Sequence, residues 1–245
     1  MSKAVSASPS EKYLDITLLR HGHSTANAKG ILAGRDNSIH LSDLGTRQAL
    51  ALVDVLKSKK FDRIITSPIT RCKETLKPLL QYLDSHTSGS RTEYAQDKRL
   101  IEMDYGLWSG RKLSTLAKKS EWSEIQRRPS SVRFPEGESF LEMQSRLSDL
   151  FSELFSEAKK PQSLLLCSHG DVIKAALAQF LGLHLDQFQR IVIDPASISQ
   201  IRLTKGGAFV IRTNDISHLT SISPRLGSEA KRRDGVRATL GGGAG

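Results

Sequence analysis

The sequence predicts an α/β protein, a three-layer α/β/α sandwich built around a mostly parallel central sheet. Short apolar runs, typical of buried strands, alternate along the chain with longer segments whose apolar residues recur every three or four positions, as in amphipathic helices. Polar residues follow directly after several of the apolar runs, which is where parallel sheets carry their functional groups. The chain has 245 residues, enough for one such domain.

The expected strands are short and separated by turn or helix signals. The run 163–167 (Ser-Leu-Leu-Leu-Cys) is the most apolar and predicts a strand buried on both faces. The two most C-terminal strands flank Lys205-Gly206-Gly207, which predicts a turn. The complete set of expected strands is 15–19, 63–66, 98–101, 163–167, 198–203 and 208–212.

Four helices are expected between these strands. The first begins after Ser42, a good N-cap residue, with Asp43 suited to the positive end of the helix dipole. The second is expected to have Pro68 at its first position. The third spans 137–159, where apolar residues step by three and four, and the fourth spans about 172–181.

The domain organisation is simple. Residues 1–12 read as a flexible lead, and residues 13–220 as a single domain. Within it, residues 103–136 mix Gly, Ser, Trp and basic residues, and we expect a partly helical excursion on the substrate side of the site. Residues 221–245 are polar, basic and then Gly-rich, and predict a disordered tail because such a segment has little apolar surface to bury.

Composition narrows the classes of function. The formal net charge of +10 suits an enzyme that attracts anionic substrates, and no nucleic-acid motif accompanies it, so no nucleic acid is expected as a partner. No apolar stretch is long enough for a membrane span or a signal peptide, and two cysteines form no disulfide framework. We therefore expect no membrane association and a cytoplasmic location, and we find no metal-ligand spacing.

The candidate catalytic residues are those that follow the apolar runs. His21 and His169 each precede a glycine, which lets the backbone approach a ligand closely. Arg20 and Arg71 are able to clamp one phosphate through their planar donor groups, and Glu102 is a candidate proton donor. Singly, each has an ordinary structural explanation; together they predict a site for phosphate chemistry.

Longer motifs around these residues resemble one family. In chain order they are 18–27, with Arg20-His21-Gly22; 41–49; 67–75, with Arg71; 102–110, with Glu102; and 168–170. This series resembles the histidine phosphatase superfamily, which includes the cofactor-dependent phosphoglycerate mutases, over about residues 15–215. The string 168–175, with 189–191 and 194–197, resembles an actinobacterial subgroup of phosphomutase-like and acid-phosphatase-like proteins.

The resemblance implies a phosphoglycerate mutase-like fold and a role for each residue. His21 is implied as the nucleophile that attacks phosphorus, and Glu102 as the group that protonates the leaving oxygen and then activates water. Arg20, Arg71 and a cationic His169 are implied to hold the phosphoryl oxygens, so that neither a metal nor a cofactor is expected. The residues expected to bind substrate are Asn27, Gly170 through its backbone amide, Ser24 and Ser197.

These observations predict a metal-independent phosphomonoesterase that hydrolyses small anionic phosphate esters through a phosphohistidine. One alternative is a cofactor-dependent phosphoglycerate mutase-type phosphomutase, since the excursion holds seven basic residues between Trp108 and Arg133. Residues 134–139 resemble the phosphatase branch instead. A catalytically silent phosphate-binding protein is a weaker alternative, because the candidate catalytic residues are all present. The natural substrate stays undetermined, and a homodimer stays open.

Overall fold

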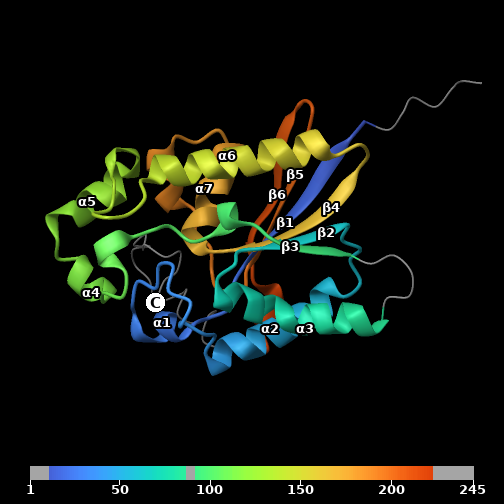
Figure 1. Cartoon of the computed structure of the whole chain (residues 1–245), viewed down its shortest axis with the longest axis horizontal. Coiled ribbons are helices and arrows are strands. Elements are labelled where there is room, and N and C mark those ends of the chain that lie inside the picture. Colours follow the sequence, from blue (N-terminus) through green and yellow to red (C-terminus); the bar gives the residue numbers. More distant parts are fainter. Residues whose placement is uncertain (1–10, 87–91, 223–245) are drawn as a thin grey trace, which may run out of the picture.

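The computed structural model describes residues 11–86 and 92–222, and these form the predicted three-layer α/β/α sandwich (Figure 1). The central sheet has six strands in the order β3-β2-β4-β1-β5-β6. Strands β3, β2, β4 and β1 are parallel neighbours, whereas β5 and β6 pair antiparallel at one side of the sheet. The strands are β1 (Tyr13–Arg20), β2 (Arg63–Thr66), β3 (Glu93–Gln96), β4 (Gln162–Ser168), β5 (Ile198–Thr204) and β6 (Gly207–Asp215).

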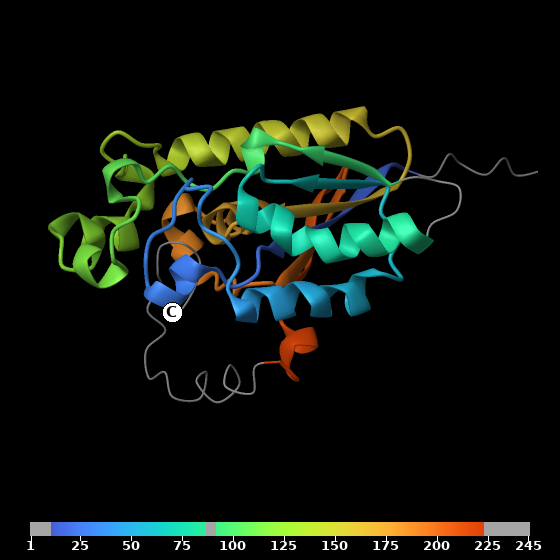
Figure 2. The same cartoon turned by 60° about the horizontal axis from the view of Figure 1, so that its bottom comes forward.

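Helices cover both faces of the sheet (Figures 1 and 2). Helices α2 (Asp43–Leu56) and α3 (Thr70–His86) lie on one face, and α6 (Phe140–Glu157) and α7 (Gly170–Phe180) on the other. Successive side chains of a strand point to opposite faces. Accordingly, Leu165 and Cys167 of β4 pack in one apolar core with α2 and α3, while Leu164 and Leu166 pack in a second core with α6 and α7.

The expected strand over 98–101 is wrong. Residues Lys98–Leu100 form a 3-10 turn, because the carboxylate of Asp97 accepts a hydrogen bond from the backbone of Arg99 and caps it. The edge strand is instead β3, whose residues Glu93–Gln96 are largely exposed and have no apolar run to reveal them. Glu102 consequently follows a turn and not a strand.

Two helix boundaries also differ from the expectation. Helix α3 begins at Thr70 and not at Pro68, and α6 begins at Phe140 because Ser139 and Glu142 form a capping box at its start. Between β1 and α2 lies a short helix, α1 (Thr25–Lys29), which is capped by Ser24. These shifts leave the order of the elements unchanged.

The segment 103–136 lies at one end of the sandwich and contains α4 (Leu113–Leu116) and α5 (Ser120–Arg127) (Figure 1). Backbone hydrogen bonds from Leu32 to Arg111 and from Leu113 to Gly30 join it to the loop after α1. Most of the predicted lead and tail, residues 1–10 and 223–245, lie outside the described residues. No helix in the described ranges has the length and apolar character needed to cross a membrane.

Candidate active site

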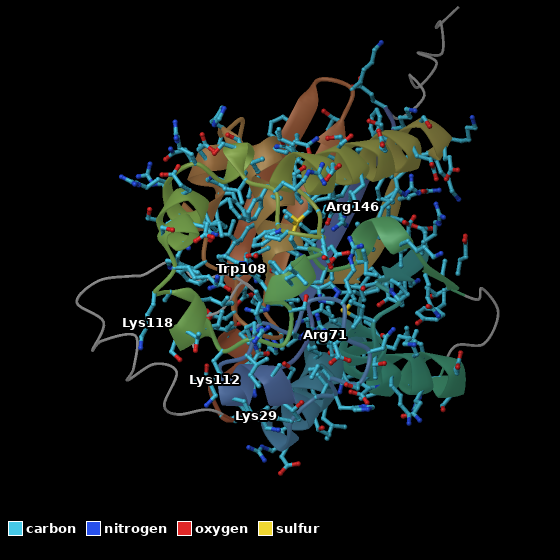
Figure 3. The ribbon with its side chains drawn as sticks, turned by 60° about the vertical axis from the view of Figure 1, so that its left-hand side comes forward. Lys29, Arg71, Trp108, Lys112, Lys118 and Arg146 are labelled. Atoms are coloured by element: carbon cyan, nitrogen blue, oxygen red, sulfur yellow. The ribbon has the colours of Figure 1, made fainter. Side chains whose placement is uncertain are left out.

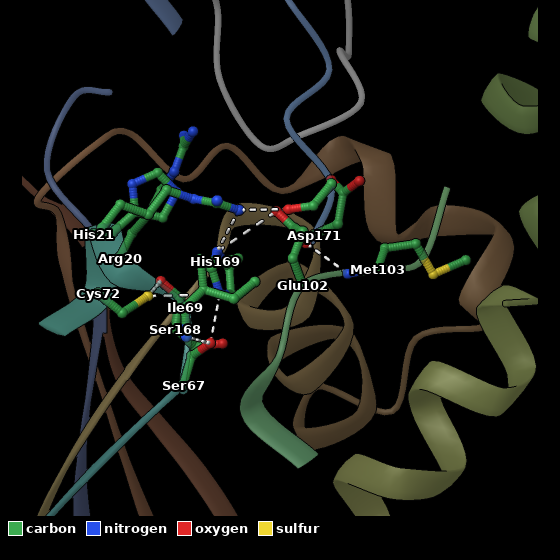
Figure 4. Close-up of polar contacts among 12 residues, drawn as sticks. Arg20, His21, Ser67, Ile69, Cys72, Glu102, Met103, Ser168, His169 and Asp171 are labelled. Carbon is green, nitrogen blue, oxygen red and sulfur yellow. Dashed lines mark hydrogen bonds and ion pairs between the residues drawn. The ribbon is translucent and has the colours of Figure 1, made fainter. Parts of the chain in front are cut away.

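The two histidines that the sequence singled out meet at the ends of neighbouring strands. Arg20, the last residue of β1, is paired with Ser168, the last residue of β4. His21 and His169 directly follow these two residues, so both lie at the same edge of the sheet. Their ring centroids lie 5.2 Å apart, with an interplanar angle of 62° (Figure 4).

His21 is held as a neutral imidazole with a defined tautomer. Its Nδ1 lies 2.7 Å from the carbonyl oxygen of Gly22, which can only accept, so Nδ1 carries the proton. Its Nε2 accepts a hydrogen bond from Nε of Arg71 at 3.2 Å. Burial, followed by the charges of Arg71 and Arg20, holds the pKa of His21 well below its usual range. Nε2 is therefore unprotonated at neutral pH, as a nucleophile requires, and its electron pair becomes available when the substrate displaces Arg71 from it.

Arg71 connects both histidines. It lies in the first turn of α3 with only 1% of its surface exposed. One terminal nitrogen, Nη2, donates to the carbonyl of Gly34 at 2.8 Å and lies 3.1 Å from Nδ1 of His169. Since a guanidinium can only donate, Nδ1 of His169 is the acceptor, and its Nε2 donates to Oγ of Ser67 at 2.8 Å.

The expectation of a cationic His169 does not hold for the ligand-free site. Burial and the charges of Arg71 and His21 lower the pKa of His169 well below its usual range. A doubly charged phosphate bound at the same place would favour the imidazolium, because an opposite charge nearby stabilises the charged form. Arg20 and Arg71 are thus the cations present before the ligand arrives.

Arg20 is held from the side of β5. Its side chain is fully buried, and one terminal nitrogen donates to the carbonyl of Ile193 at 2.6 Å. Burial lowers its pKa, and the negative charges of Glu102, Asp194 and Asp171 oppose that shift. The segment that follows Ile193 also fixes the backbone of the motif, since Ala196 donates to the carbonyl of His21 at 3.0 Å.

Glu102 completes the group. Its carboxylate is 4% exposed and lies 3.8 Å from Nδ1 of His169, and its other oxygen accepts from the backbone of Met103 at 2.9 Å. Burial raises the pKa of Glu102 to about 7, with a further contribution from the negative charge of Asp171. A carboxyl group with this pKa can both donate and accept a proton near neutral pH.

The loop between α1 and α2 holds Arg71 and Glu102 together. Arg35 donates through Nε to the backbone carbonyl of Glu102 at 2.9 Å, next to Gly34, whose carbonyl holds Arg71. Arg35 also pairs with Glu138, which in turn pairs with Arg146. Sequence reasoning missed Gly34 and Arg35, and nothing in the residue pattern marks them because both act on or through main-chain carbonyls.

The four residues expected to bind substrate have local structural contacts. Ser24 and Asn27 form the capping box of α1, and Ser24 is only 1% exposed. Ser197 is equally buried, and its carbonyl accepts from the backbone of Arg20 at 3.1 Å. Gly170 is the first residue of α7, so its amide lies at the positive end of a helix. Contact of these four with substrate stays a prediction.

Close packing of two glycines fixes the loop that follows His21. A Cβ atom added to Gly45 of α2 would lie 2.0 Å from the carbonyl oxygen of His23, and one added to Gly22 would lie 2.9 Å from the carbonyl oxygen of Gly45. Helix α2 thus packs backbone to backbone against the loop. Any larger residue at position 45 would push the loop out of place.

Comparison with known proteins identifies the family. A sequence model of the histidine phosphatase superfamily (branch 1) matches residues 16–216, most of the chain. The chain belongs to this superfamily. As a histidine phosphatase it is an enzyme, in agreement with the resemblance drawn from the motifs.

Relatives of this histidine phosphatase carry both phosphatase and mutase names. It is 30% identical to "Probable phosphoglycerate mutase GpmB" of Proteus mirabilis, over 86% of this chain and 97% of the relative. It is 26% identical to "Phosphoserine phosphatase 1" of Hydrogenobacter thermophilus, over 83% of this chain and 93% of the relative. Its fold resembles the solved mycobacterial glucosyl-3-phosphoglycerate phosphatase (TM-score 0.70, 23% identity), over 83% of this chain and 99% of that one.

Proposed function

We propose that this histidine phosphatase is a metal-independent phosphomonoesterase that hydrolyses small anionic phosphate esters through a phosphohistidine at His21. The main observation behind the proposal is the arrangement of His21, Arg71 and Glu102. His21 is neutral, and its Nε2 accepts a hydrogen bond from the guanidinium of Arg71. Glu102, whose pKa is raised to about 7, lies 3.8 Å from His169. A nucleophile, a charge-stabilising group and a proton donor are the three elements that phosphoryl transfer through a covalent intermediate needs.

The proposed first step transfers the phosphoryl group to the enzyme. Nε2 of His21 attacks phosphorus, the bond between phosphorus and the ester oxygen breaks, and Glu102 gives its proton to the departing oxygen. The donors of Arg71 that face Nε2 of His21 and Nδ1 of His169 are those that phosphoryl oxygens would take over. Because His21 and Glu102 are each only 3% exposed, the substrate has to displace internal contacts of this kind as it binds.

The proposed second step returns the enzyme to its starting state. Glu102, now a carboxylate, takes a proton from a water molecule as that water attacks phosphorus. The bond between phosphorus and Nε2 breaks and inorganic phosphate leaves; the alcohol was already released in the first step. Each step conserves the proton count, since the proton that Glu102 gives up in the first step is recovered in the second.

A preference for small anionic substrates is supported by the charges of the excursion. Arg127 and Arg128 share the single carboxylate of Glu124, and Arg133 pairs with Glu142, so most of the positive charge of these three arginines is already offset. Lys29 and Lys112 are exposed and lie on segments joined by a bridge between Ile31 and Lys112 (Figure 3). They would attract anions toward this end of the molecule.

The alternative function is a cofactor-dependent phosphoglycerate mutase-type phosphomutase, which the kinship to a protein named as a mutase favours. Product analysis separates the two. A phosphatase releases free phosphate from a panel of phosphomonoesters, whereas a mutase moves phosphate between the hydroxyls of 3-phosphoglycerate. We expect free phosphate. Rearranged phosphoglycerate without phosphate release would contradict the proposal.

Turnover is expected to be independent of metal ions. Arg20 and Arg71 supply the positive charge that Mg²⁺ supplies in many phosphoryl-transfer enzymes. Activity on phosphomonoesters should therefore be unchanged after exhaustive dialysis against EDTA, and vanadate should inhibit because it mimics five-coordinate phosphorus. Loss of turnover on chelation, with recovery on adding Mg²⁺, would contradict this expectation and show that the two arginines do not supply enough positive charge.

A further inference from the structure

One peptide group connects Arg35 with the carboxylate of Glu102. The carbonyl oxygen of Glu102 and the N–H of Met103 belong to the same peptide group, which is planar. Nε of Arg35 donates to that oxygen at 2.9 Å, and the N–H donates to Oε1 of Glu102 at 2.9 Å (Figure 4 draws this second bond). Because the plane is rigid, a group that holds its oxygen also holds the N–H that orients the carboxylate.

Arg35 is itself held in one orientation, since each of its three guanidinium nitrogens has an acceptor. Besides the bond from Nε, Nη1 donates to Oδ2 of Asp104 at 3.2 Å and Nη2 donates to Oε2 of Glu138 at 3.0 Å. The side chain of Glu138 is only 11% exposed, and Nε of Arg146 donates to its other oxygen at 2.7 Å. A planar guanidinium bound at three points cannot turn without losing several of these bonds.

The residues on either side of Arg35 hold a different part of the site. The carbonyl of Gly34 accepts from Nη2 of Arg71 at 2.8 Å, and the carbonyl of Asp36 accepts from Nη1 of Arg71 at 3.4 Å. Gly34 has a φ of +54°, and a Cβ atom added there would lie 2.6 Å from Oγ of Ser109. The main chain at this point is thus fixed by its own packing, and its grip on Arg71 does not require the side chain of Arg35.

We propose that Arg35 is a positioning residue for the proton donor: through the peptide plane between Glu102 and Met103, it keeps the Glu102 carboxylate aligned with the leaving oxygen. This inference rests on the proposed function, in which Glu102 is the acid. Arg35 contacts the main chain of Glu102, so its effect on the reaction passes through that backbone.

Arg146 is the other side chain that reaches the same carbonyl, and its contact is the weaker one. Its Nη2 lies 3.5 Å from the carbonyl oxygen of Glu102, against 2.9 Å for Nε of Arg35. The remaining donors of Arg146 contact Glu138 and the carbonyl of Arg99. Removing Arg35 therefore leaves the peptide group with one long hydrogen bond, and Glu102 free to move away from the leaving oxygen.

The test replaces Arg35 with methionine, which is similar in length and has no donors. With β-glycerol phosphate, whose alkoxide needs protonation, kcat/KM of Arg35→Met should fall by about 10–100-fold, the effect of displacing a catalytic group by a fraction of an ångström to 1 Å. With p-nitrophenyl phosphate, whose leaving group hardly needs the acid, kcat/KM should change by less than about threefold. Competitive inhibition by inorganic phosphate should stay nearly unchanged, because Arg71 keeps its contacts with the main chain.

A matched control uses Arg133, which likewise binds a backbone carbonyl, that of Gly137 at 3.1 Å, and a glutamate, Glu142. Arg133→Met should keep wild-type kcat/KM with both substrates. An equal loss of both activities in Arg35→Met, or the same selective loss in Arg133→Met, would overturn the inference. If Arg35→Met fails to fold, Arg35→Lys keeps the charge but lacks the Nε donor, and it should show the same selectivity with a smaller loss.

Amide hydrogen exchange at Met103 tests the inference without relying on activity. The N–H of Met103 should exchange about tenfold faster or more in Arg35→Met than in the wild type, since a hydrogen bond from a charged group no longer holds its peptide plane. Exchange that is unchanged would overturn the inference. If exchange rises while the wild type releases no phosphate from any monoester, the positioning role is supported and the proposed function is the part that fails.

Discussion

Replacing His21 with alanine is expected to lower turnover of phosphomonoesters by about 10⁴–10⁶-fold, the range seen when a covalent nucleophile is removed. We expect no rescue by His169, because its Nε2 donates to Ser67 and its Nδ1 is contacted by both Arg71 and Glu102. The measurement is steady-state release of phosphate, together with thermal unfolding to show that the variant remains folded.

A matched control uses a histidine away from the site. His86 lies exposed at the C-terminal end of α3, with its Nδ1 near the carbonyl of Tyr82 at 2.9 Å. His86→Ala should keep wild-type turnover. If His21→Ala kept more than a few per cent of the wild-type rate, the attack would have to be assigned to another group or directly to water.

Glu102→Gln is expected to slow phosphoryl transfer from alkyl phosphates by roughly 10²–10⁴-fold, the usual range for a positioned acid. An alkoxide leaves poorly unless it is protonated, whereas p-nitrophenolate departs almost unaided, so the first step with p-nitrophenyl phosphate should be affected much less. Hydrolysis of the phosphoenzyme would still lack its base. Stopped-flow measurement should therefore show a burst of p-nitrophenol followed by a slow steady state.

A uniform loss across good and poor leaving groups, without a burst, would argue against Glu102 as the acid. Glu102 would then act by orienting its neighbour His169, from which it is 3.8 Å away. The proton donor would have to be sought nearby. Asp104 and Glu138 are the acidic candidates, because both pair with Arg35, which also donates to the backbone carbonyl of Glu102.

The layers of the fold could be predicted because apolar periodicity records which surface each element buries. The run Leu164–Cys167 marks β4 as a central strand, and α6 follows its apolar stripe closely. Strand β3 was not predicted because an exposed edge strand has no buried face, so its sequence shows no alternation of apolar and polar residues. The sequence predicts a strand at 98–101 because Leu100 and Ile101 are adjacent apolar residues, whereas Lys98–Leu100 form a turn capped by Asp97.

The sequence was enough to predict which residues form the candidate site, but not their protonation states. The register of β1 and β4 brings His21 and His169 together, as the parallel sheet implied. The protonation state of His169 could not be read from sequence, because it depends on complete burial beside Arg71. Asp171 was visible in the string that follows His169, but its hydrogen bond with Tyr105 arises only when α7 and the excursion pack together.

The central claim, a phosphohistidine at His21, is tested most directly by trapping the intermediate. Enzyme mixed with ³²P-labelled phosphomonoester and quenched within milliseconds should carry label that is stable to base and lost in acid, and peptide mass spectrometry should place it on His21. With labelled p-nitrophenyl phosphate as the donor, Glu102→Gln should accumulate more of it, because its hydrolysis is slowed while its formation hardly needs the acid. Label on any other residue, or label of equal amount in His21→Ala, would contradict the account.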